Sequence, residues 1–152
     1  MRTRILFVVV ALALSLVAAP AATGGQPAKK TRSLQGTLTM AMIGPNGQSG
    51  SKFAGEFAGR PLGKAAVLFQ NTIEGSTSTG KAVIYTKRGT IRANATNQLQ
   101  PQPDGSVQTP GTFKITGGTG RYRGASGSGT FEGGVPANST IFVLTLKGKI
   151  RY

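Results

Sequence analysis

Few residues in this chain could act as catalytic groups or as metal ligands. The 152 residues contain no histidine and no cysteine. Catalytic triads built on either residue type, and ordinary zinc sites, are therefore excluded. General acid and base chemistry would need a carboxylate that faces an enclosed site. The candidates are the four acids Glu56, Glu74, Asp104 and Glu132.

The pattern around these acids predicts that all four lie outside the core. Apolar and polar residues alternate in this part of the chain, which puts Phe57 on the inner face of a strand and Glu56 on its outer face. The other three acids fall on outer faces or in a polar loop. A register slip of one residue would turn Glu56 inward and reverse this conclusion. We therefore predict no catalytic residue, no metal site and no cofactor.

One polar residue shares the inner-facing phase of its strand. Asn71 follows Ala65, Val67 and Phe69 at every second position. Two interpretations remain open. The amide either orients a ligand inside the fold, or it lies at the end of the strand and is solvated.

The charge balance is strongly basic, with 18 Lys and Arg residues against 4 acids and a net charge of +14. Such a chain is expected to be attracted to anionic envelope polymers or lipid surfaces, and the attraction weakens as salt rises. The alternative is that the charge serves only to keep the protein soluble. Nucleic acid is a weaker candidate, because few aromatic residues are interleaved with the basic ones. The predicted basic face comprises Lys114, Arg121, Arg123, Lys147, Lys149 and Arg151.

The glycine run Gly117–Gly120 precedes two of these arginines and has the composition of a phosphate loop. A phosphate cradle needs a helix to start after the glycines, and we expect a strand there instead. Nucleotide binding at this run is therefore excluded. We expect Tyr122 to pack under the turn.

The amino terminus has the features of an export signal. Arg2 and Arg4 precede an apolar run that is shorter than the ~20 residues of a membrane span, and small residues follow it. We predict a signal peptide over residues 1–21, a disordered basic lead-in over 22–32 and one domain over 33–152. The expected location is secreted or extracytoplasmic, with no transmembrane segment after cleavage. The absence of cysteine means that the domain must fold without disulfides.

The remaining sequence is all-β. Short segments with a period of two are separated by Gly, Pro and Asn, and no segment has helical spacing. Asn97–Pro110 is too polar for a core and is predicted to be a surface loop. The eight expected strands are 34–43, 51–59, 64–73, 79–86, 90–95, 111–116, 125–132 and 142–152.

Eight antiparallel strands with one apolar face form either a sandwich or a closed barrel, and closure removes the exposed edges. Glycines in the inner-facing phase favour a small barrel, because they allow sharp coiling. They either permit a bend or leave a cavity, and we favour the bend. The glycines concerned are Gly55, Gly127, Gly129 and Gly148.

The run Ile115–Gly127, Ile-Thr-Gly-Gly-Thr-Gly-Arg-Tyr-Arg-Gly-Ala-Ser-Gly, resembles the glycine-rich hairpin of the allene oxide cyclase and dirigent barrel superfamily. The resemblance is sharpest over Gly111–Glu132. It implies an eight-stranded antiparallel β-barrel. It also implies that a hydrophobic small molecule is bound or shaped inside the barrel, and that the chain could form a homo-oligomer, as some plant members do.

Two functions follow from these features. The first is a secreted, non-enzymatic barrel that binds a small apolar ligand, an anionic envelope surface, or both. The alternative is an isomerase that resembles allene oxide cyclase, or a dirigent-like protein, with a cavity of roughly 300 Å³ or more. The predicted ligand-binding residues are Phe53, Phe57, Phe69, Asn71, Phe142 and Leu144.

Overall fold

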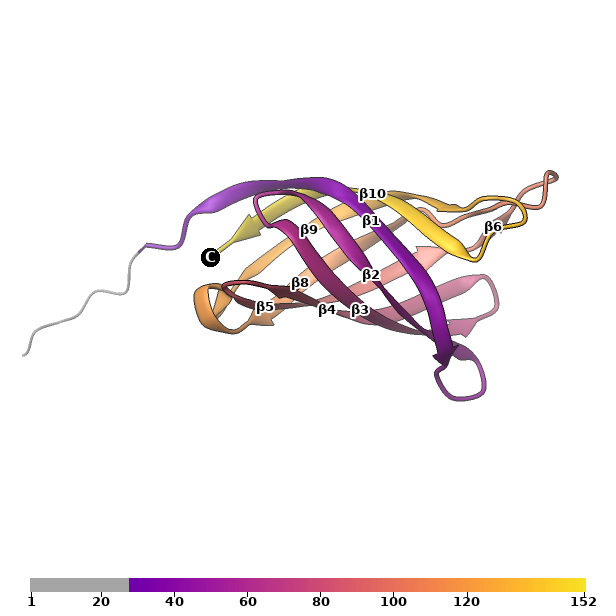
Figure 1. The fold of residues 1–152 in the computed structure, drawn as a ribbon, viewed down its shortest axis with the longest axis horizontal. Coiled ribbons are helices and arrows are strands. Elements are labelled where there is room, and N and C mark those ends of the chain that lie inside the picture. Colours follow the sequence, from indigo (N-terminus) through magenta and orange to yellow (C-terminus); the bar gives the residue numbers. More distant parts are fainter. Residues whose placement is uncertain (1–27) are drawn as a thin grey trace, which may run out of the picture.

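Alternating apolar and polar residues produce eight long strands, which Figure 1 shows wrapped around one axis. The computed structural model describes residues 28–152. The long strands are β1 (Thr31–Pro45), β2 (Gly50–Arg60), β3 (Gly63–Glu74), β4 (Thr77–Thr86), β5 (Gly89–Gln98), β8 (Gly111–Gly118), β9 (Ser126–Val135) and β10 (Ile141–Arg151).

The sheet closes on itself. Every pairing is antiparallel, and the order runs β10-β1-β2-β3-β4-β5-β8-β9, with β9 returning to pair with β10. Closure leaves no long strand with an unpaired edge among the described residues. The predicted eight-stranded antiparallel β-barrel is therefore confirmed, and the sandwich is not what forms.

The strands are longer than the sequence pattern predicts. The first begins at Thr31, so the last two residues of the predicted lead-in, 22–32, already pair with β10. Thr31 lies opposite Arg151, and Arg32 lies opposite Ile150. Backbone pairing at this position does not depend on an apolar side chain, which is why alternation alone missed it. The predicted signal peptide, residues 1–21, lies outside the described residues.

The segment predicted to be a surface loop contains two short strands, β6 (Gln100–Pro101) and β7 (Val107–Gln108), which pair with each other. Strand β7 also pairs with the end of β9, Val107 opposite Val135 and Gln108 opposite Gly134. The prediction of an irregular loop is wrong, because unpaired backbone groups at the end of β9 provide partners for β7.

The glycine run leads into a short 3₁₀ helix, η1 (Gly120–Tyr122), rather than directly into a strand. Gly120 has a φ of 56° and Gly124 a φ of 65°, values that favour glycine and allow the chain to reverse on either side of this turn. Tyr122 is 3% exposed, so the prediction that it packs under the turn is confirmed.

The two ends of the barrel differ. At one end, where β1 begins and β10 finishes, the interior is filled by apolar side chains: Leu34, Ile91, Tyr122, Ala125 and Ile150 are each at most 3% exposed. We call this the closed end. At the opposite end, which we call the open end, lie β6, β7 and the turns that leave β1, β3 and β9 (Figure 1).

Phenylalanine rings on the inner face cover glycines of neighbouring strands. A Cβ on Gly129 would lie 2.6 Å from Cζ of Phe113, and a Cβ on Gly148 would lie 3.0 Å from the same atom. Phe57 covers Gly36 in the same way, with its Cζ at 2.6 Å. We expected these glycines either to permit a bend or to leave a cavity, and neither alternative fully describes Gly129 and Gly148. Their missing side chains let the backbones approach closely, and the space above them is occupied by a ring.

We predict that Gly129→Ala destabilises the barrel. The added Cβ would collide with the Phe113 ring and with Cα of Gly148, 2.7 Å away, and overpacking of this kind costs about 1–3 kcal/mol. The free energy of unfolding in urea measures the effect. Ser128→Ala, on the exposed outer face of the same strand, is the matched control and should change stability by under about 0.5 kcal/mol. Equal stability of the two variants would contradict this account.

Candidate functional site

The barrel lumen is a cavity of about 420 Å³. All eight long strands contribute side chains to its wall, and apolar residues make up most of the lining. The volume lies within the range of small-molecule sites, which are commonly 300–1,000 Å³. The lumen can therefore accommodate a small organic molecule.

Every residue predicted to bind a ligand lines this cavity. Phe53, at 5% exposed, is the centre of an aromatic cluster, with its ring centroid 5.9 Å from that of Phe69 and 5.1 Å from that of Phe142. The Phe142 ring meets Phe53 edge-on at 80°, a favoured aromatic geometry. The lining residues named by the sequence are Phe53, Phe57, Phe69, Asn71, Phe142 and Leu144.

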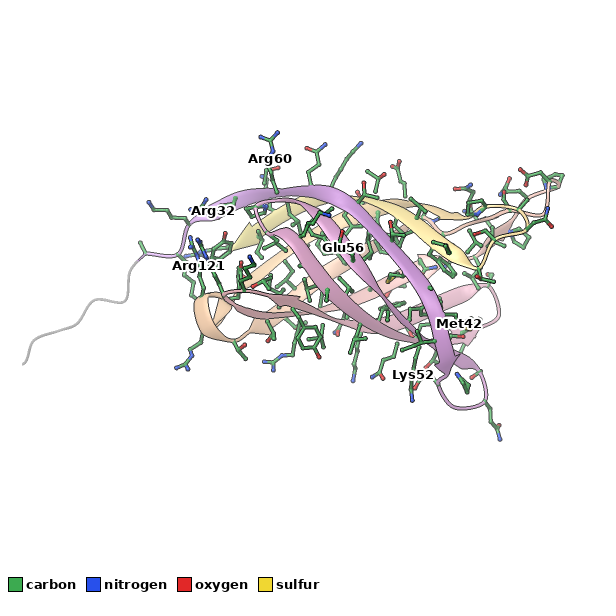
Figure 2. The ribbon with its side chains drawn as sticks, in the orientation of Figure 1. Arg32, Met42, Lys52, Glu56, Arg60 and Arg121 are labelled. Atoms are coloured by element: carbon green, nitrogen blue, oxygen red, sulfur yellow. The ribbon has the colours of Figure 1, made fainter. Side chains whose placement is uncertain are left out.

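The cavity opens beside β6 and β7. Its solvent-exposed lining residues, which include Met42, Gly105, Pro136 and Asn138, all belong to segments at the open end. Met42 is 55% exposed, and Figure 2 shows it at the end of the barrel away from Arg32. A ligand would therefore enter at the open end.

The turn between β6 and β7 is held by a local hydrogen-bond cluster. Asp104 Oδ1 accepts from the Ser106 hydroxyl at 2.7 Å and from the Ser106 backbone N–H at 2.9 Å. These bonds lower the pKa of the Asp104 carboxyl, the hydroxyl contributing more than the backbone N–H. The cluster shapes the turn that carries Val107 and Thr109, two residues of the cavity mouth.

Asn71 is 7% exposed, so the interpretation that it is solvated at a strand end is wrong. Its Oδ1 accepts from the Ser51 backbone N–H at 2.9 Å, and its Nδ2 donates to the Ser78 hydroxyl at 2.9 Å. The Asn46 side chain donates to the Asn71 backbone carbonyl, also at 2.9 Å. Asn71 thus ties β2, β3 and β4 together at the open end.

Asn97 is the polar lining residue that the sequence interpretation missed. It is 8% exposed, lies opposite Ser78 in the β4–β5 ladder and lines the cavity. In the part of the chain that the structure describes, its side-chain amide makes no hydrogen bond to protein, unlike that of Asn71. The signal was present, because Asn97 continues the inner-facing alternation of Ile91, Ala93 and Ala95.

Among the residues described, no charged side chain lines the lumen. All four acids are exposed, as predicted, and Glu56 pairs with Lys64 on the outer surface at 3.7 Å. Within residues 28–152 there is also no group of three or more acidic, histidine or cysteine residues that could hold a metal ion. The chemistry that the lumen itself offers is apolar contact and hydrogen bonding by amides and hydroxyls.

The predicted basic residues are all exposed, but they do not form a single row. Lys114 and Lys149 flank Ser128 on the barrel wall, whereas Arg121 and Arg123 lie at the closed end. The structure adds basic residues from four other segments to this end: Lys29, Lys30, Arg32, Arg60, Lys87 and Arg88.

The acids do not balance this cluster. Glu74 and Asp104 lie at the open end, and Glu56 is already paired with Lys64. The closed end is therefore strongly cationic while the lumen is uncharged. Sequence inspection could not gather these residues, because they come from strand ends and turns that only barrel closure brings together.

Comparisons with known proteins do not place the chain in a family. No protein-family model matches the sequence, and no curated protein or solved structure gives a significant match. In the region described, no helix has the length and apolar character needed to cross a bilayer. What is established is the closed eight-stranded antiparallel barrel.

We predict that Asn71→Leu destabilises the fold. The substitution leaves the Ser51 N–H and the Ser78 hydroxyl without their partner, and each buried unpaired group costs about 1–3 kcal/mol. Chemical denaturation gives the loss in unfolding free energy. Asn94→Leu, on the exposed outer face of β5, is the control and should change stability little. If both variants unfold at the same denaturant concentration, the Asn71 network contributes nothing measurable.

Proposed function

We propose that this protein is an exported, non-enzymatic barrel that holds a small, uncharged, apolar molecule in its lumen. The observation that carries the proposal is the cavity of about 420 Å³, lined by apolar residues and open at one end. Burial of apolar surface is the main source of affinity that such a site offers.

The lining also selects against charged molecules. A charged group taken from water into the lumen would lose its hydration and find no ionic partner among the described lining residues. An uncharged oxygen or nitrogen atom could bond to the Asn97 amide. The ligand class supported best is therefore an apolar molecule with one neutral hydrogen-bonding group.

The second candidate is an isomerase or cyclase, or a dirigent-like protein, acting on a hydrophobic small molecule. Two observations support it: the likeness of the glycine-rich hairpin to the allene oxide cyclase and dirigent superfamily, and a cavity larger than roughly 300 Å³. Such an enzyme would depend on shape and on neutral groups such as Asn97, because no carboxylate, lysine or arginine among the described residues reaches the lumen. The lining therefore favours holding over catalysis.

An anionic envelope surface, polymer or lipid, is the proposed second partner. The support is the cluster of exposed basic residues at the closed end, which the four acids leave largely unbalanced. Because this cluster lies at the end opposite the cavity mouth, attraction to a surface would leave the lumen accessible. Export is part of this proposal and rests on the predicted signal peptide.

We predict that the protein binds the uncharged fluorescent probe N-phenyl-1-naphthylamine saturably and with increased fluorescence. Ala82→Phe places a ring in the cavity and should weaken binding at least fivefold. Thr79→Phe, on the exposed outer face of the same strand, adds a ring outside the cavity and should change binding less than twofold. A saturable signal that is equal in the two variants would mean that the probe binds elsewhere.

We also predict binding to phosphatidylglycerol vesicles that weakens as NaCl rises, with little binding to phosphatidylcholine vesicles. Attraction between exposed charges is screened within about 8 Å at physiological salt. Co-sedimentation across a salt series measures it. Equal and salt-insensitive partitioning onto the two kinds of vesicle would remove the anionic-surface part of the proposal and leave the cavity part intact.

A further inference from the structure

The closed end of the barrel is capped by Tyr152. Strands β1 and β10 pair up to this point, and Tyr152 exchanges two backbone hydrogen bonds with Lys30, of 2.9 and 3.3 Å. Tyr152 has the same inner-facing phase as Ile150, and it packs against the hydrophobic core. Tyr152 is half-buried, at the point where the ladder ends.

The glycine-rich segment supports this cap. The ring of Tyr122 packs edge-on against the ring of Tyr152, with centroids 4.8 Å apart and an interplanar angle of 64°. The backbone N–H of Arg121 donates to the Arg88 carbonyl at 2.9 Å, which fixes η1 against the β4–β5 turn. The position of the Arg121 side chain is therefore set by the same segment that buries Tyr122.

Two guanidinium groups meet the ring of Tyr152. Cζ of Arg32 lies 5.7 Å from the ring centroid, and Cζ of Arg121 lies 5.5 Å from it, both within the range of cation–π contacts. Figure 2 shows the two arginines at the same end of the barrel. Over residues 28–152, neither guanidinium donates a hydrogen bond to protein. Neither forms an ion pair in this range, where the ion pair joins Lys64 and Glu56.

Among the described residues, no acidic side chain pairs with these two guanidinium groups, so their positive charge is not neutralised. Both guanidinium groups lie over one ring, and neither donates a hydrogen bond to protein among the described residues, so their N–H groups can donate to an oxyanion. Contact with the ring also restricts the two side chains before any ligand arrives, so less conformational entropy is lost on binding. An anion that bonds to both groups would offset their like charge.

We propose that Arg32 and Arg121, which lie over the ring of Tyr152, form a clamp for a phosphate group at the closed end of the barrel. Phosphate matches the clamp better than a carboxylate, because two arginines can approach its tetrahedral oxygens from different sides. Inorganic phosphate can carry two negative charges, and the phosphodiester of phosphatidylglycerol carries one. The surrounding basic residues Lys30, Arg88 and Arg123 strengthen the local field.

The clamp rests on the proposed attraction to an anionic surface and names the chemical group that would be recognised there. A phosphate group can come from a lipid headgroup or from inorganic phosphate in solution. In either case the bound group lies at the end of the barrel away from the cavity mouth, so both sites can be occupied at once.

Titration calorimetry of the purified protein with inorganic phosphate, and separately with phosphatidylglycerol vesicles, tests the clamp and distinguishes the two sources. The double variant R32Q/R121Q should bind at least tenfold more weakly than the parent protein. The control K52Q/K81Q removes two exposed positive charges from the outer barrel wall, away from the closed end, and should change binding less than twofold.

A second double variant, R32K/R121K, keeps the charge but loses the planar, bidentate donors. It should weaken binding at least threefold if the clamp operates, whereas a diffuse positive field predicts no change. Circular dichroism shows whether each variant is folded. Because the lysine variant preserves charge, it tests the clamp even where the glutamine variant fails to fold.

The outcomes separate the clamp from the wider proposal. If R32Q/R121Q loses binding to both inorganic phosphate and vesicles, the result supports a clamp that accepts free phosphate. If it loses vesicle binding alone, the result supports a clamp for lipid-borne phosphate. Equal losses in K52Q/K81Q and R32Q/R121Q overturn the clamp but leave the surface attraction standing. A parent protein that binds neither probe overturns both.

Discussion

The close packing of phenylalanine rings on glycines of adjacent strands is the constraint on which the lumen depends. An eight-stranded barrel has an interior that side chains can just fill. Here the rings of Phe57 and Phe113 lie against glycines of the wall, where a Cβ would stand within about 3 Å of them. Rings held against the wall do not cross the lumen. Ala82 on β4 and Ala93 on β5 have small side chains that extend little into the lumen, so a cavity of about 420 Å³ remains.

The same closure separates two chemical environments along one axis. Apolar side chains fill the closed end, and the residues beyond them, at the ends of strands, have only solvent to face. Basic residues such as Arg32 and Arg121 gather there at little desolvation cost, since their charges remain in water. At the open end, polar groups are instead buried and must bond to one another, as Asn71 does with Ser51 and Ser78. The difference between the ends follows from where the core stops.

Alternation along the sequence predicts the strands and the residues of the cavity wall, whereas the inner-facing glycines and the likeness of the hairpin favour a barrel over a sandwich. Each of the inner-facing phenylalanines that we named lines the lumen, because a period of two fixes the face of every side chain once the register is known. The hairpin of β6 and β7 could not be predicted in this way. It forms through backbone pairing with the end of β9, which no side-chain pattern records. Polarity predicts that Asn97 belongs to that loop, although its phase in the alternation predicts that it faces inward.

The glycine-rich run shows why a motif predicts architecture more readily than chemistry. Its composition first suggests a phosphate loop, which is excluded because only a three-residue 3₁₀ helix, and no α-helix, follows the glycines. In the structure the glycines allow a single 3₁₀ turn, and that turn buries Tyr122 beneath Tyr152 while leaving Arg121 exposed above it. Any anion recognition at this end therefore belongs to side chains that the turn positions. The backbone N–H groups of Thr119 and Arg121 already donate to the carbonyls of Thr90 and Arg88, and those of Tyr122 and Arg123 donate within the turn. Arg32, the second guanidinium, comes from a segment nearly ninety residues earlier in the chain and was predicted to be disordered. The two arginines reach the same ring because β1 pairs with the end of β10 from its first residue, Thr31. The closed end therefore acquires its arrangement of charges only when the barrel closes.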